Sequence, residues 1–171
     1  MVSLLVVSAL LYQSCGSPVA QVKYTHPGWD TLEFGGWIIQ VPDGFELDSD
    51  PGKIISKKDS VEIRFDVWTE PNADYEDCAS DELEQNHESS LEWCEEFYHN
   101  GSEHKVRTET VNGRYAVFSR PIKTGHGTLS IHFSECHHSL AMSAFDLTKE
   151  QEELVLEMFA TIDWKWKEKG Q

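Results

Sequence analysis

The most informative gap in this sequence of 171 residues is a gap in positive charge. Residues 66–104 contain no Lys or Arg, although thirteen of them are acidic. Over the whole chain, 30 acidic residues stand against 14 basic ones, and the formal net charge is −16. This balance argues against a nucleic-acid partner or an anionic membrane surface, because both require a basic footprint. It favours a basic protein or a hard cation, although acidic surfaces also serve solubility alone.

Known catalytic motifs are absent as well. The chain has no Gly-x-Ser-x-Gly, no His-Glu-x-x-His, no phosphate loop and no Cys-x-x-Cys. The acidic stretch also lacks the Asp-x-Asp-x-Asp-Gly spacing of a calcium loop. The sequence therefore predicts a protein that is not an enzyme, carries no cofactor and works by binding.

No apolar run reaches the roughly 20 residues that span a bilayer. Residues 2–11 are almost wholly apolar and have the length of a signal-peptide core. The junction Ser14-Cys15-Gly16 that follows resembles a bacterial lipoprotein signal. We therefore expect a signal over residues 1–15, a lipid on Cys15 as the only membrane attachment, and a tether over residues 16–33. The chain would then reside in the bacterial periplasm. The alternatives are a signal cleaved after Ser17 or Ala20, with free secretion, or a buried core segment.

Cysteine is sparse, with four in the chain. If Cys15 carries lipid, three remain, and export permits one disulfide. We expect Cys94 to form it. Cys78 is one candidate partner, but an unbroken helix would hold the two Cα atoms about 24 Å apart, whereas a disulfide needs roughly 4.4–6.8 Å. That pairing therefore requires a helix break near residues 86–90. Cys136 is the alternative partner.

Hydrophobic periodicity predicts an α+β domain. Val61, Ile63, Phe65 and Val67 alternate with polar residues, as in a strand with one buried face. Asn112-Gly113 is a strong hairpin signal, and Thr148 with Gln151 has the spacing of a capping box. We expect a mainly antiparallel sheet of five to seven strands and two principal helices within residues 34–166, followed by a tail over 167–171. The expected strands span 36–42, 54–56, 61–68, 106–111, 114–120, 129–135 and 140–146, and the first helix spans 74–98.

Three segments carry a resemblance to a known family. They are Val-Pro-Asp-Gly-Phe at 41–45, Val-Asn-Gly-Arg-Tyr-Ala at 111–116, and the closing helix that runs from residue 147 into Asp163-Trp164. In this order they resemble the PsbP-like α/β/α sandwich over about residues 34–166. The family includes a photosystem subunit, a Ran-binding import factor, small bacterial envelope lipoproteins and periplasmic immunity proteins. The resemblance implies protein binding and supplies no catalytic residue.

The acidic segment is the candidate partner-binding site. On a helix, several of its glutamates fall on neighbouring turns and repel one another. Arginines or lysines of a partner would relieve that repulsion, and nearby aromatic residues could serve as anchors. In this interpretation the site comprises Glu88, Glu92, Trp93, Glu95, Glu96, Phe97 and Tyr98. The protein could thus be an immunity-type protein that neutralises a basic effector. The alternative is that these carboxylates are only solvated and that loops such as residues 42–50 bind.

A second cluster suggests a different function. Imidazole, thiolate and carboxylate groups are good zinc ligands. They gather at His132, Glu135, Cys136, His137 and His138. A metal-handling or redox envelope protein using this hairpin is therefore the alternative function. Adjacent strand residues point to opposite faces, however, and a polar hairpin tip would explain the cluster without a metal.

Overall fold

The computed structural model describes residues 24–69, 80–99, 104–135 and 137–164, and side chains within the first helix from 84 to 96. The predicted signal segment with Cys15, residues 16–23 of the predicted tether and the predicted tail lie outside these residues. None of the helices described is long and apolar enough to cross a membrane. In chain order the elements are β1 (Asp30–Phe34), β2 (Trp37–Val41), β3 (Phe45–Leu47), β4 (Lys53–Ser56), β5 (Val61–Thr69), α1 (Ser80–His99), β6 (His104–Val111), β7 (Arg114–Pro121), β8 (Thr128–Glu135), β9 (His138–Phe145), α2 (Lys149–Ala160) and β10 (Asp163–Trp164).

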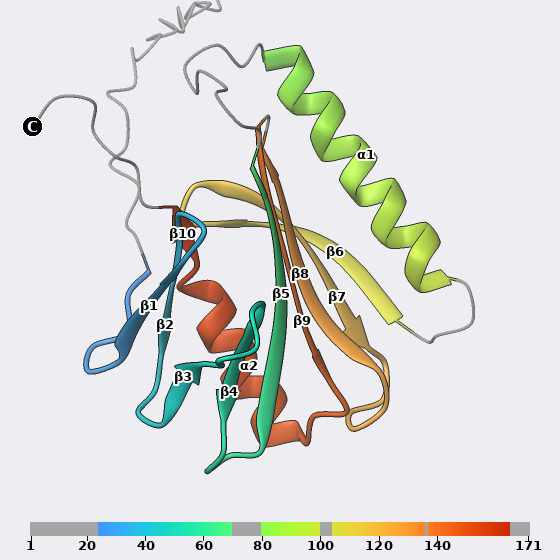
Figure 1. Ribbon diagram of the computed structural model, residues 1–171. Coiled ribbons are helices and arrows are strands. Elements are labelled where there is room, and N and C mark those ends of the chain that lie inside the picture. Colours follow the sequence, from blue (N-terminus) through green and yellow to red (C-terminus); the bar gives the residue numbers. More distant parts are fainter. Residues whose placement is uncertain (1–23, 70–79, 100–103, 136, 165–171) are drawn as a thin grey trace, which may run out of the picture.

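The strands form two antiparallel sheets. The larger has seven strands in the order β3-β4-β5-β9-β8-β7-β6, and the smaller has the order β1-β2-β10. Helix α1 lies on one side of the larger sheet, and α2 lies on the other side together with the smaller sheet (Figure 1). The expected α+β architecture, with two helices and a mainly antiparallel sheet, is confirmed.

The main core lies between the larger sheet and the layer formed by α2 and the smaller sheet. Trp37, Phe133 and Phe159 are its largest fully buried side chains. Strand β5 contributes the buried side chains of Val61 and Ile63, as its alternating pattern predicts. Its polar residues consequently point to the opposite face, the one that carries α1.

Local signals explain two of the connections. Asn112 and Gly113 have positive φ values of 48° and 84°, as a two-residue type I′ turn requires, and they join β6 to β7. The Thr148 side chain accepts a hydrogen bond from the Gln151 backbone, and the Gln151 side chain accepts one from the Thr148 backbone. Two backbone amides at the start of α2 are thereby satisfied, and the predicted capping box is confirmed.

Besides the unexpected strands β3 and β10, the structure differs from expectation at two places. Residues 30–33, expected as part of a tether, belong to β1, because Gly35 and Gly36 form a two-residue turn with φ values of 55° and 86°. A Cβ at Gly36 would lie 2.6 Å from the Trp164 ring, so only glycine fits there. Second, α1 is continuous through residues 86–90. The helix break that a Cys78–Cys94 bond would require is therefore absent, and the prediction of that break is wrong.

Candidate partner-binding surface

Helix α1 rests on the outer face of the larger sheet, over β6, β7 and β8. Its sheet-facing side is formed by His87, Ser90, Leu91 and Cys94, which recur at the three- and four-residue spacing of one helical face. Cys94 and Val117 are buried together, and Leu91, Val106 and Tyr115 pack around them. This small cluster, separate from the main core, holds the helix on the sheet.

Two aromatic contacts extend this attachment. The rings of His87 and Tyr115 stack with centroids 4.1 Å apart. The ring centroids of Trp93 and His132 lie 5.8 Å apart, although Trp93 keeps 51% of its surface exposed. Burial lowers the pKa of His132, and it also lowers the pKa of His87 against the opposing effects of Glu135 and a backbone hydrogen bond at Ser134. Both imidazoles are therefore held in the neutral form at neutral pH.

Cys94 is a free thiol in the structure, and only 2% of its surface is exposed. Burial raises the pKa of this thiol to about 11, so almost no thiolate exists at neutral pH. The expected disulfide through Cys94 is not seen. Both of its candidate partners, Cys78 and Cys136, lie outside the described residues.

The side of α1 that faces away from the sheet is acidic. Glu84, Glu88, Glu92 and Glu96 follow one another at four-residue spacing, and Glu95 lies beside them. All five are exposed, and none forms an ion pair with a residue that the structure describes. We call these five glutamates the acidic face.

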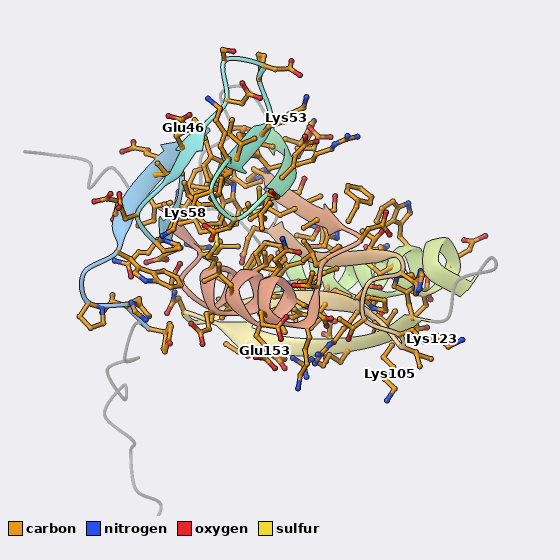
Figure 2. The ribbon with its side chains drawn as sticks, turned by 90° about the horizontal axis from the view of Figure 1, so that it is seen from below. Glu46, Lys53, Lys58, Lys105, Lys123 and Glu153 are labelled. Atoms are coloured by element: carbon orange, nitrogen blue, oxygen red, sulfur yellow. The ribbon has the colours of Figure 1, made fainter. Side chains whose placement is uncertain are left out.

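The predicted site residues are thus partly brought together. Four of the five glutamates of the acidic face were predicted, and Trp93 lies on a flank of the same helix. Phe97 and Tyr98 continue α1, but their side chains lie outside the described residues. The helix has no Lys or Arg, whereas Figure 2 shows Lys53, Lys58, Lys105 and Lys123 on strands and turns of the sheet. The negative charge of α1 is therefore not neutralised from within the helix.

The alternative metal ligands do not converge. His132 lies on the outer face, opposite Ala141 and Val117, where it meets Trp93 of α1. Glu135 and His138 are cross-strand partners on the inner side, where Glu135 pairs with Arg114 and His138 contacts the Trp164 ring. His137 lies in the turn, and Cys136 is outside the described residues. Among the residues that are described, no group of three metal-ligating side chains is close enough to hold an ion.

Sequence reasoning did not single out Trp68 at the end of β5. The indole is 54% exposed, more than any other large hydrophobic side chain among the described residues. The alternation along β5 contains the signal, because Val67 is an inward position and its neighbour must point outward. Trp68 consequently shares the outer face with α1.

Two solved structures are similar to this chain. The chain is similar to cyanobacterial PsbP from Synechocystis, with 10% identity and a TM-score of 0.42, over 86% of this chain and 99% of that one. It is also similar to a protein from Bacteroides thetaiotaomicron, with 9% identity and a TM-score of 0.45, over 80% of this chain and 47% of that one. The chain thus spans about half the length of the Bacteroides protein. No protein-family model and no curated protein sequence matches it. The likeness concerns the fold alone.

Proposed function

We propose that this chain is an exported binding protein that docks a basic protein partner on the acidic face of α1. The observation that carries the proposal is the acidic face itself, whose five exposed glutamates have no ion-pair partner among the described residues. Such an arrangement is costly for an isolated helix. It becomes favourable when a partner supplies the missing cations.

The energetics support this interpretation. Like charges four residues apart destabilise a helix by about 0.2–0.5 kcal/mol per pair. Glu84, Glu88, Glu92 and Glu96 form three such pairs in succession. A partner's arginines or lysines would offset these repulsions with attractions of their own. The same field would accelerate association over long range, with a rate that falls as salt rises.

The surroundings of the acidic face suit an interface. Trp93 presents half of an indole next to the glutamates, and tryptophan is enriched among residues that dominate binding energy. Phe97 and Tyr98 follow it along α1 as further candidate anchors. In the finer form of the proposal the partner is a basic toxic effector, and the chain is its immunity protein in the bacterial envelope.

The location is a separate part of the proposal. We infer from the Ser14-Cys15-Gly16 junction that Cys15 is lipidated in a bacterial envelope. Cys15→Ser should then move the protein from the membrane fraction to the soluble fraction after export. A wild-type protein that is already fully soluble after export would refute lipidation and leave the binding proposal untouched.

A capture experiment tests the binding proposal. Wild type and an α1 variant are each immobilised as bait, and the basic proteins that each retains from the native envelope are identified. The α1 variant carries lysine in place of Glu88, Glu92, Glu95 and Glu96. A matched control reverses Asp30, Glu46, Glu153 and Glu157, which are exposed acids outside α1. We expect the control to retain the partner and the α1 variant to lose it. Equal retention by both variants would refute the proposal.

A further inference from the structure

The outer face of the larger sheet continues beyond α1 onto β9 and β5. Asp66 of β5, Ala141 of β9 and His132 of β8 form one cross-strand row, and Trp68 pairs with Ser139 in the next row. Neighbouring strands lie about 4.8 Å apart, so the backbones of Asp66 and His132, two strands apart, are separated by roughly 10 Å. Ala141 lies between them as a small floor. We call Asp66, Trp68, Ser139 and Ala141 the Trp68 strip.

Aromatic side chains border this strip on two sides. Trp68 lies at one edge with 54% of its surface exposed. At the other edge His132 is in contact with Trp93, whose indole is also half exposed. Trp68 and Trp93, which belong to different elements, thus lie at the two edges of a strip that contains the small residues Ala141 and Ser139.

The charge in the strip is uncompensated. Asp66 is exposed and has no ion-pair partner among the described residues, and the Trp68 ring has neither a ring partner nor a cation partner there. Arg64 lies two residues before Asp66 on the same face of β5, and there the chain itself supplies a cation, an aromatic ring and a carboxylate. The Arg64 guanidinium lies 5.4 Å from the centroid of Phe145, and its Nε donates to Glu62 over 2.8 Å. The Trp68 strip has the ring and the carboxylate but lacks the guanidinium.

We propose that the Trp68 strip binds an arginine side chain of a protein partner, with the guanidinium stacked on Trp68 and paired with Asp66. This inference rests on the proposed function, since the arginine belongs to the same basic partner that α1 docks. Arginine fits better than lysine because its planar guanidinium stacks on an aromatic face while its edge still donates hydrogen bonds to a carboxylate. Trp93 closes the far side of the site and connects it to the acidic face.

Model peptides test this site without the natural partner. Dye-labelled hexa-arginine, hexalysine and the neutral hexacitrulline are titrated against the full chain, and binding is followed by fluorescence anisotropy. We expect hexa-arginine to bind more tightly than hexalysine and hexacitrulline not to bind. Asp66→Asn and Trp68→Ala should each weaken hexa-arginine binding roughly threefold to thirtyfold. Trp68→Ala should also abolish the preference for arginine over lysine.

Matched controls and the α1 variant separate the two proposals. Glu157→Gln and Ile122→Ala remove an exposed carboxylate and an exposed apolar side chain elsewhere, and should bind as wild type does. Lysines at Glu88, Glu92, Glu95 and Glu96 should weaken both cationic peptides alike and preserve the arginine preference. Wild-type binding by Asp66→Asn and Trp68→Ala would overturn the arginine site, even if the α1 variant still lost binding. No preference for arginine in the wild type would overturn it too.

Discussion

The His87 ring lies parallel to the Tyr115 ring, with 4.1 Å between the centroids and 13° between the planes. This stack joins α1 to β7 on the side of the helix that carries Leu91 and Cys94. Because His87, Leu91 and Cys94 pack against the sheet, the glutamates of the acidic face are left on the solvent side. The attachment of the helix and the exposure of the acidic face therefore have the same origin.

The acidic face should weaken its own helix. Glu92 has Glu88 and Glu96 four residues away and Glu95 three residues away. Glu92→Lys replaces these repulsions with attractions and should stabilise α1 by about 1 kcal/mol at low salt. Amide hydrogen exchange within α1 measures this as slower exchange, with Glu92→Gln giving a smaller gain. The gain should shrink at high salt, and faster exchange in Glu92→Lys would contradict the electrostatic account.

Stability should fall when the protein is acidified, in part through His138. Burial, with smaller effects of His137 and Arg114, lowers the pKa of this imidazole to about 4, whereas an unfolded histidine titrates near 6.5. The folded state therefore binds the proton less readily than the unfolded state. Above pH 6.5 the imidazole is neutral in both the folded and the unfolded state and does not lower the stability. Stability is lost as the pH falls from 6.5 towards 4, because only the unfolded state takes up the proton. Between pH 7 and pH 5 the loss from this residue should be about 2 kcal/mol.

Urea unfolding of wild type and His138→Phe at pH 7 and pH 5 isolates this effect. The phenyl ring keeps an aromatic contact with Trp164 but does not titrate. We expect the variant to lose less stability than wild type between the two pH values. An identical loss in the two proteins would show that His138 is not desolvated as the structure indicates.

The Cys94 thiol should be unreactive in the folded protein. It is buried beneath α1, and its pKa of about 11 leaves little thiolate to attack an alkylating reagent. Iodoacetamide should therefore modify Cys94 only after unfolding, and no reductant should be needed. Peptide mapping of exported protein provides the measurement. A Cys94 that is modified only after reduction would mean that it forms a disulfide.

A charged pair anchors α2 to the sheet. The Arg120 Nε donates to the Glu152 carboxylate, which is 1% exposed, while the arginine remains partly exposed. Arg120→Ala leaves a buried carboxylate unpaired and should destabilise the fold by roughly 3 kcal/mol. Glu152→Ala leaves only a solvated guanidinium and should cost less. In urea unfolding the double variant should lose less than the sum of the two, and strict additivity would argue against coupling.

Much of the fold could be predicted because it depends on local signals. Asn112-Gly113 and the Thr148 capping box act within a few residues, and the alternation along β5 reports directly on its buried face. The smaller sheet was harder to predict, because β10 pairs with β2 across more than a hundred residues of sequence. A strand of two residues contains no local sequence pattern that predicts its pairing partner.

Only part of the candidate surface could be predicted, because the rest also depends on contacts between residues far apart in the sequence. Helical spacing alone aligns Glu88, Glu92 and Glu96, so the acidic face follows from the sequence. The closeness of Trp93 to His132, and of both to the row that begins at Asp66, depends on how α1 crosses the sheet. That crossing is a tertiary property, and the sequence pattern of either element does not contain it.

Association kinetics with the captured basic partner test the central claim most directly. The rate is measured at low and high salt for wild type, for the variant with lysine at Glu88, Glu92, Glu95 and Glu96, and for the control with four acids reversed outside α1. Circular dichroism first confirms that each protein is folded. We predict that only the α1 variant associates far more slowly at low salt and loses the salt dependence of the wild type. An unchanged rate with unchanged salt dependence would remove the acidic face from the interface.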